Sequence, residues 1–360
     1  MYLLVPYLLI KDNRTASAAT LVEAGALSGA QDGNRTTPLM QACAHGRVGI
    51  VQLLLEASPH DLEAMDAYLM MTPLHFVAQF TLARFNPKNY EGNEHDSEQV
   101  ALLLLNAGAD PNHLHPEDNG SPLLFACAKG NLGAARALLR AGADLNLAER
   151  SRGYTPFLVA SEQGHTAVMQ LLLLHGCNPN VTTDGGATAL MLASKSERPE
   201  AIELLISWSI DIEATDLQGF SALQYALVRN VPFRHLHTPG DAASDDDNED
   251  KEVSEKTLHC IRLLLTAGAN PERTDARYEA GPALALATIR GQPSLVELLL
   301  AHGAVPDAKA EPDGEVTALT MATLLGKTEI AEMLLQAGAN PAYDISVLDP
   351  TFEKPNRRGA

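Results

Sequence analysis

A short phrase returns eight times along the chain and limits what the chain can fold into. It reads TPLMQACAHG from Thr37, SPLLFACAKG from Ser121 and TALTMATLLG from Thr317. The eight copies begin at Thr37, Thr72, Ser121, Thr155, Thr188, Ser221, Pro282 and Thr317. Self-similarity of this kind predicts an architecture in which one supersecondary unit is stacked many times.

Each copy has the chemistry of a short helix. The first residue usually carries a hydroxyl, which can accept a hydrogen bond from a free N–H of the first helical turn. Pro38 and its equivalents occupy the first helical position, where a missing N–H costs nothing. Gly46 and its equivalents end that helix nine residues after the cap. A Leu-rich second helix follows, and a further glycine ends it.

Two of the intervals between copies are too long. The intervals are 35, 49, 34, 33, 33, 61 and 35 residues. The extra residues, at about 80–95 and 231–256, lie between the first and second helix of one repeat. We therefore expect two insertions within repeats, because recognisable repeat sequence lies on both sides of each.

These phrases resemble the ankyrin repeat, whose signature is T-P-L-H-x-A in a unit of about 33 residues. The resemblance covers about residues 1–342 and leaves residues 343–360 as a tail. It implies an all-α solenoid of about nine helix-turn-helix repeats with β-turn fingers and two loop insertions. Residues 1–32 form a degenerate first repeat in this interpretation, because an end repeat lacks a neighbour on one face.

The repeat that starts at Thr188 departs most from this pattern. Glu197 stands where glycine is usual, and WSID (208–211) replaces the usual AGAD. Among the eight copies, His75 alone keeps the histidine of T-P-L-H. We expect the Thr188 repeat to be a locally less stable part of the array.

The chain is strongly acidic, with a net charge of −19. Such a charge repels a phosphate backbone, so nucleic-acid binding is not expected. In the second insertion, residues 240–256 contain eight acidic residues among seventeen, and we expect a disordered acidic loop. Ser244 precedes three aspartates, which predicts a phosphorylation site for an acidophilic kinase. Asp250 and Lys256 stand where a calcium loop starting at Asp245 would need Gly and Glu.

The sequence gives no pattern typical of an enzyme or of a cofactor site. No phosphate-binding glycine loop, nucleophile elbow or H-E-x-x-H motif is present. The pairs His113/His115 and His235/His237 lack further ligands at metal-site spacing, and no two of the four cysteines have C-x-x-C spacing. We expect no catalysis, no metal and no cofactor.

The resemblance implies a concave face lined by the finger turns and by the exposed ends of the first helices. Carried over repeat by repeat, this face holds several cations and aromatic residues, which are common anchors of interfaces. We expect partner contacts from Lys129, Arg152, Tyr154, Lys195, Phe220, Arg229 and Arg290. The partner would be a protein with an acidic or extended segment.

The function expected from these features is non-enzymatic protein binding as an adaptor, scaffold or inhibitor. A substrate-targeting subunit of a larger modifying complex and an enzyme with an unrecognised site are the alternatives. Phe80, Phe85 and Tyr90 of the first insertion either pack on the array or anchor a partner. The opening stretch MYLLVPYLLI is too short to span a bilayer, and we expect a cytoplasmic or nuclear protein that does not insert into membranes.

Overall fold

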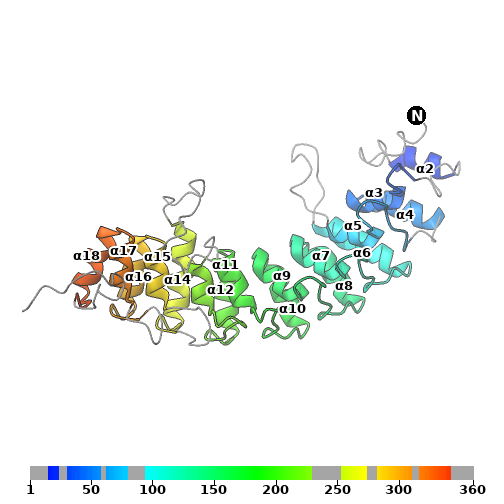
Figure 1. Ribbon diagram of the computed structural model, residues 1–360. Coiled ribbons are helices and arrows are strands. Elements are labelled where there is room, and N and C mark those ends of the chain that lie inside the picture. The colour runs from blue at the N-terminus through cyan, green and yellow to red at the C-terminus, as the bar shows by residue number, and fades with distance from the viewer. Residues whose placement is uncertain are drawn as a thin grey trace, which may run out of the picture. The chain divides into compact units, whose positions relative to one another are not determined.

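The computed structural model describes residues 15–23, 31–57, 62–79, 94–228, 253–273, 282–309 and 316–341. Short α-helices connected by turns make up these residues (Figure 1). The chain divides into two compact units, Met1–Asp184 and Gly185–Ala360. The predicted opening stretch, the tail 343–360, Arg229, Ser244, Phe80, Phe85 and Tyr90 lie outside the described residues.

The described residues of unit 1 form four helix pairs and one further helix. The first helices of the pairs are α3 (Pro38–Ala44), α5 (Pro73–Ala78), α7 (Pro122–Lys129) and α9 (Pro156–Gln163). The second helices are α4 (Val48–Ala57), α6 (Glu94–Asn106), α8 (Leu132–Arg140) and α10 (Thr166–Leu174). The helix α2 (Thr15–Glu23) packs on α4, and its assignment to a degenerate first repeat stays a prediction.

In unit 2, the residues that the structure describes form four helix pairs. The first helices are α11 (Ala189–Lys195), α13 (Ala222–Leu227), α15 (Ala283–Ile289) and α17 (Ala318–Leu324). The second helices are α12 (Pro199–Ser207), α14 (Glu255–Thr266), α16 (Pro293–Ala301) and α18 (Thr328–Gln336).

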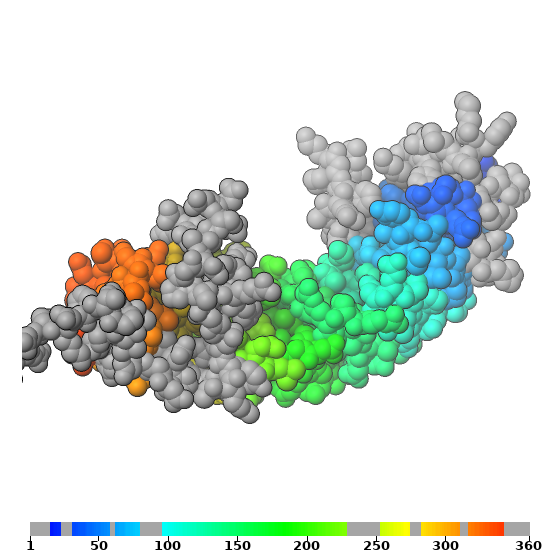
Figure 2. Space-filling model, in the orientation of Figure 1, coloured from blue at the N-terminus to red at the C-terminus, as the bar shows by residue number. Residues whose placement is uncertain are grey.

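Within each unit, first helices pack on first helices and second helices on second helices. Figure 1 shows this as two rows of helices in unit 1, and Figure 2 shows the described residues of α3 to α10 as an unbroken surface. The predicted all-α repeat solenoid is confirmed. Both long intervals fall between the two helices of one repeat, after α5 and after α13, as the spacing predicted.

Hydroxyl caps start most of the first helices. In six repeats, the hydroxyl oxygen accepts a hydrogen bond from the backbone N–H three residues on, at 3.2 to 3.5 Å. Thr72 differs from the prediction, because its hydroxyl bonds to Nδ1 of His75 at 2.8 Å and makes no such cap. His75 competes for the oxygen that caps the helix in the other repeats.

The core of each unit consists of Leu, Ala, Val, Ile and Met side chains from both rows. Phe157, Leu158 and Met169 in unit 1, and Ile202 and Leu264 in unit 2, have no exposed surface. Burying each large side chain stabilises the fold by about 1.5–3 kcal/mol. The small residues of the first helices, such as Ala126, allow neighbouring helices to approach closely.

A ladder of hydrogen bonds links successive repeats after the second helices. In each rung, a side-chain oxygen of one repeat accepts from a backbone N–H of the next, at 2.8 to 3.0 Å. The rungs are Glu63 to Asp110, Asn112 to Asp144, Glu213 to Asn270, Glu272 to Val305, and Asp307 to Asn340. Each rung fixes the spacing of two neighbouring repeats within a unit.

Glu197, in the turn between α11 and α12, bonds to the residues that follow the second insertion. Its backbone has a positive φ of 52°, the left-handed conformation that glycine adopts elsewhere in the array. Its Oε1 accepts hydrogen bonds from the hydroxyls of Ser254, at 3.0 Å, and Thr257, at the start of α14. The Glu197 side chain, which stands in place of a glycine, therefore anchors the start of α14 after the insertion. This contact favours order in the repeat that the sequence predicted to be less stable.

Replacing Glu197 by Gly should lower the free energy of unfolding by about 2 kcal/mol. Hydrogen bonds to a charged group contribute about 1.5–3 kcal/mol each, which outweighs the ~1 kcal/mol that glycine gains in a left-handed conformation. Glu197→Ala should lose about 1 kcal/mol more, because it keeps the strained backbone. Urea unfolding measures both changes, and hydrogen exchange should be faster at the start of α14. A Glu197→Gly protein as stable as the wild type would show that the anchor contributes little.

Candidate functional site

Finger turns precede the first helices, and neighbouring fingers are connected through their backbones. In unit 1, N–H groups of one finger donate to carbonyls of the preceding finger at 2.7 to 2.9 Å. The pairs are Ala67 to Asn34, Arg150 to Asp118, and Asp184 to Arg152. In unit 2, Leu217 donates to Gly185 at 3.0 Å. Each of these bonds holds two neighbouring fingers together, so their backbones are positioned before a partner binds.

A single carboxylate folds each of several fingers. Asp66 accepts from the backbone N–H groups of Tyr68, Leu69 and Met71 at 2.8 to 3.2 Å. Partial burial acts to raise the pKa of Glu149, but hydrogen bonds from Ser151, Arg152 and Tyr154 hold this pKa below its ordinary value. Carboxylates at these positions therefore fix the backbone of the finger and are already bonded.

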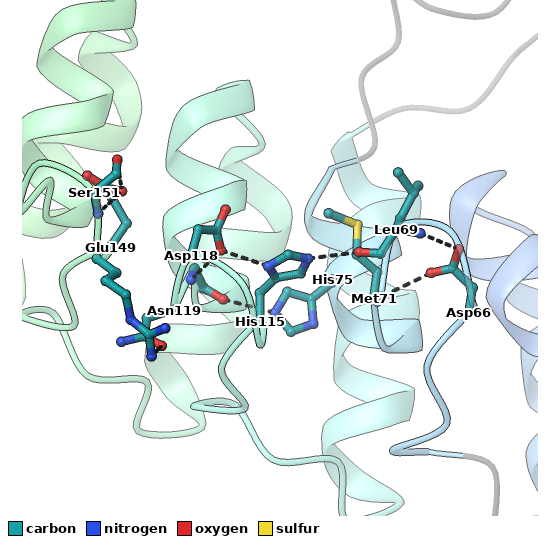
Figure 3. Close-up of polar contacts among 11 residues, drawn as sticks. Asp66, Leu69, Met71, His75, His115, Asp118, Asn119, Glu149 and Ser151 are labelled. Carbon is teal, nitrogen blue, oxygen red and sulfur yellow. Dashed lines mark hydrogen bonds and ion pairs between the residues drawn. The ribbon is translucent and has the colours of Figure 1, made fainter.

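Two histidines link the third and fourth repeats from opposite directions (Figure 3). His75 of α5 is fully buried, and its Nε2 donates to the carbonyl of Gly120 at 3.2 Å. In the opposite direction, Nε2 of His115 bonds to the carbonyl of Leu69 at 2.8 Å. The Nδ1 of His115 lies 2.8 Å from Oδ1 of Asp118. Burial lowers the pKa of His75 to about 4, so this ring is neutral at pH 7. Its Nδ1 is then free to accept from the Thr72 hydroxyl.

The described residues contain no group of three or more His, Cys, Asp and Glu side chains placed to hold a metal ion. Nδ1 of His113 pairs with Glu63 at 2.8 Å. The longest described helix, α6, has 13 residues, and none of the described helices combines the length and hydropathy that a membrane span needs.

Comparison with protein families agrees with the repeat geometry. A model of three consecutive ankyrin repeats matches residues 91–183, 158–233 and 252–344, and a single-repeat model matches residues 34–67. The chain belongs to the ankyrin repeat family. Ankyrin repeats are protein–protein interaction modules, so protein binding is the general role of this array. A comparison with individual curated proteins gave no match.

Three of the residues predicted to face a partner are exposed cations on the ankyrin array. Lys129 is the last residue of α7, Arg152 lies on the finger before α9, and Lys195 ends α11. The first two belong to unit 1 and the third to unit 2. Whether they contact a partner remains a prediction.

Tyr154 is half-buried and donates its hydroxyl to Oε1 of Glu162 at 3.1 Å. Burial raises the pKa of Tyr154 to about 12, and the nearby charge of Glu162 adds to this effect. The ring therefore supports the finger against α9.

Phe220 was expected on the partner-facing surface, and that prediction is wrong. Its side chain is 2% exposed and packs edge-on against Tyr225, with ring centroids 6.5 Å apart. The reason is the finger backbone: Asp216 accepts from the N–H of Phe220 at 2.8 Å, which closes the finger with the ring on the core side.

Arg290 contributes to packing within unit 2. Its Nη1 donates to the carbonyl of Leu227 at 2.8 Å, which joins the end of α15 to α13.

Five exposed apolar residues around one finger of the ankyrin array were not selected from the sequence as contact residues. Tyr68 is 80% exposed, and Met65, Leu69, Met70 and Leu114 are 38 to 42% exposed. The signal for them was present: Met70 occupies the place of the finger glycines Gly153, Gly186 and Gly219, counting back from the helix cap.

The buried, neutral His75 predicts an acid-sensitive stability. Its pKa is lowered from 6.5 to about 4. Between these two pH values His75 is protonated in the unfolded chain and neutral in the folded chain. Between pH 7 and pH 5, the free energy of unfolding should fall by about 2 kcal/mol from this group. Urea unfolding at both pH values measures the loss.

The control separates His75 from the other groups that titrate. His75→Gln should lower stability at pH 7 but remove most of this pH dependence, whereas His175→Gln, at an exposed site of the same unit, should keep it. An equal dependence on pH in the wild type and in His75→Gln would contradict the assignment.

Proposed function

We propose that the protein is a non-enzymatic adaptor, scaffold or inhibitor that binds a protein partner through its fingers and the ends of its first helices. The observation that carries this proposal is the placement of cations in unit 1. Lys129, Arg150 and Arg152 are exposed on that face, and the described residues offer them no carboxylate partner.

The cations of the second helix α8 are arranged differently. Arg136 and Arg140 of α8 both bond to Glu98 of α6, at 2.7 and 2.8 Å. Their charge therefore serves packing between repeats. In a chain of net charge −19, unpaired cations on a preformed edge favour a partner segment that is acidic and extended.

A cytoplasmic or nuclear location belongs to the same proposal. It is supported by Cys43, Cys127, Cys177 and Cys260, which are all free and buried. Burial raises the pKa of each thiol, which keeps it protonated and unreactive. Free thiols are ordinary in a reducing compartment.

The double variant Lys129→Ala/Arg152→Ala should lose the partner, because it removes two unpaired charges from the proposed face. Affinity capture from native lysate with quantitative mass spectrometry compares this bait with the wild type and with Arg140→Ala. Arg140 is a matched control because it is an exposed cation of the same unit on a second helix. Wild-type binding should also weaken at high salt.

Circular dichroism confirms beforehand that each bait is folded. Partners that are retained by the double variant and lost by Arg140→Ala would place binding on the second helices and overturn the proposal.

A further inference from the structure

The five exposed apolar residues noted above lie on two neighbouring fingers and are here called the fingertip surface: Met65, Tyr68, Leu69, Met70 and Leu114. Hydrogen bonds between side chains and the backbone hold these fingers. Asp66 fixes the finger that carries Tyr68 and Leu69, and His115, next to Leu114, bonds to the carbonyl of Leu69 at 2.8 Å. The surface is therefore ordered before any partner arrives, which reduces the entropic cost of binding.

The backbone of this region is strained in a way that glycine would relieve. Met70 has φ 51° and the equivalent Arg35 of the preceding finger has φ 57°. Gly153, Gly186 and Gly219 occupy the same left-handed position in later fingers, with φ of 72° to 79°. A side chain is disfavoured in this conformation. Met70 and Arg35 thus display exposed side chains against a conformational cost, and such strain points to function.

Positive charge flanks the fingertip surface on both sides. Arg35 lies on the preceding finger, and Arg150 and Arg152 lie two fingers further on. The described residues offer none of the three a carboxylate partner, and Arg150 bonds only to the amide oxygen of Asn119 among side chains.

The carboxylates of the same region are mostly engaged. Asp66 and Glu149 bond to their own fingers, Glu63 pairs with His113, and Asp118 lies against His115. Glu117 is the exposed carboxylate between the two groups of arginines. The unbalanced charge around the apolar residues is therefore positive.

We propose that the fingertip surface binds an extended segment of a protein partner in which an aromatic or aliphatic side chain is flanked by carboxylates. The apolar side chain lies against Tyr68, Leu69 and Met70, and the carboxylates meet Arg35 on one side and Arg150 and Arg152 on the other. This inference rests on the proposed function and names the chemistry of the segment. A lipid surface is the weaker occupant, because a chain of charge −19 is repelled by anionic membranes.

Selection from a displayed library of random peptides tests the inference on the full chain. Wild-type protein should enrich peptides that combine an apolar residue with neighbouring Asp or Glu. Tyr68→Ser/Leu69→Ser should lose the preference for apolar residues and keep the preference for acidic ones. Arg150→Ala/Arg152→Ala should lose the preference for acidic residues and keep the preference for apolar ones. Leu174→Ser is the matched control, because Leu174 is 79% exposed at the end of α10 and should bind as the wild type does.

The variant Met70→Gly separates a binding role from a structural one. It should raise the melting temperature, because glycine relieves the left-handed strain. It should also weaken binding of an enriched peptide by about tenfold, the effect of removing one interface anchor. Fluorescence anisotropy with that peptide measures the affinity. A higher melting temperature with unchanged affinity would overturn the role of Met70.

The remaining outcomes distinguish this inference from the function on which it rests. Enriched peptides that tolerate Tyr68→Ser/Leu69→Ser would refute the fingertip surface and leave the protein-binding function standing. Failure of every bait to enrich any peptide would refute both. Binding to phosphatidylserine vesicles that Tyr68→Ser/Leu69→Ser abolishes, without peptide enrichment, would assign the surface to a membrane.

Discussion

Every repeat of this protein depends on its neighbours, because its helices are too short to be stable alone. The helix α5 has 6 residues and α7 has 8, whereas an isolated helix is marginal in water even at about 12–15 residues. Burial of Leu, Ala and Met side chains between successive pairs supplies the missing stability. The ladder from Glu63 to Asp110 and its equivalents fixes the spacing of the pairs, so the position of each finger follows from the packing behind it.

Most of the fold could be predicted because its determinants are local. A hydroxyl, a proline and a glycine at fixed spacing, all three or some of them, mark each first helix, and the gaps in that spacing located both insertions between two helices. Thr72 does not cap its helix as predicted, because its hydroxyl bonds to His75, a histidine that the other repeats lack. Such a contact depends on which side chains meet in space, which spacing alone does not reveal.

The binding surface was less predictable, and Phe220 explains why. Its place beside the helix cap put it on a finger, but the residue directly before a cap is turned toward the core. Met71, which precedes Thr72 as Phe220 precedes Ser221, is 5% exposed, whereas Tyr68 at the tip of the same finger is 80% exposed. Lys129 and Arg152 were easier to place, because long cations at helix ends and turn tips extend into solvent.

The contacts of Glu197 also bear on where the chain can be lengthened. Val228 and Val253, on the two sides of the second insertion, are both buried, and the contact of Glu197 with Ser254 and Thr257 lies just beyond. For a flexible connection held at both ends, each doubling of its length costs about 0.6 kcal/mol of loop-closure entropy. This stretch therefore offers a place where a reporter domain or a peptide tag can be inserted without disturbing the helices on either side.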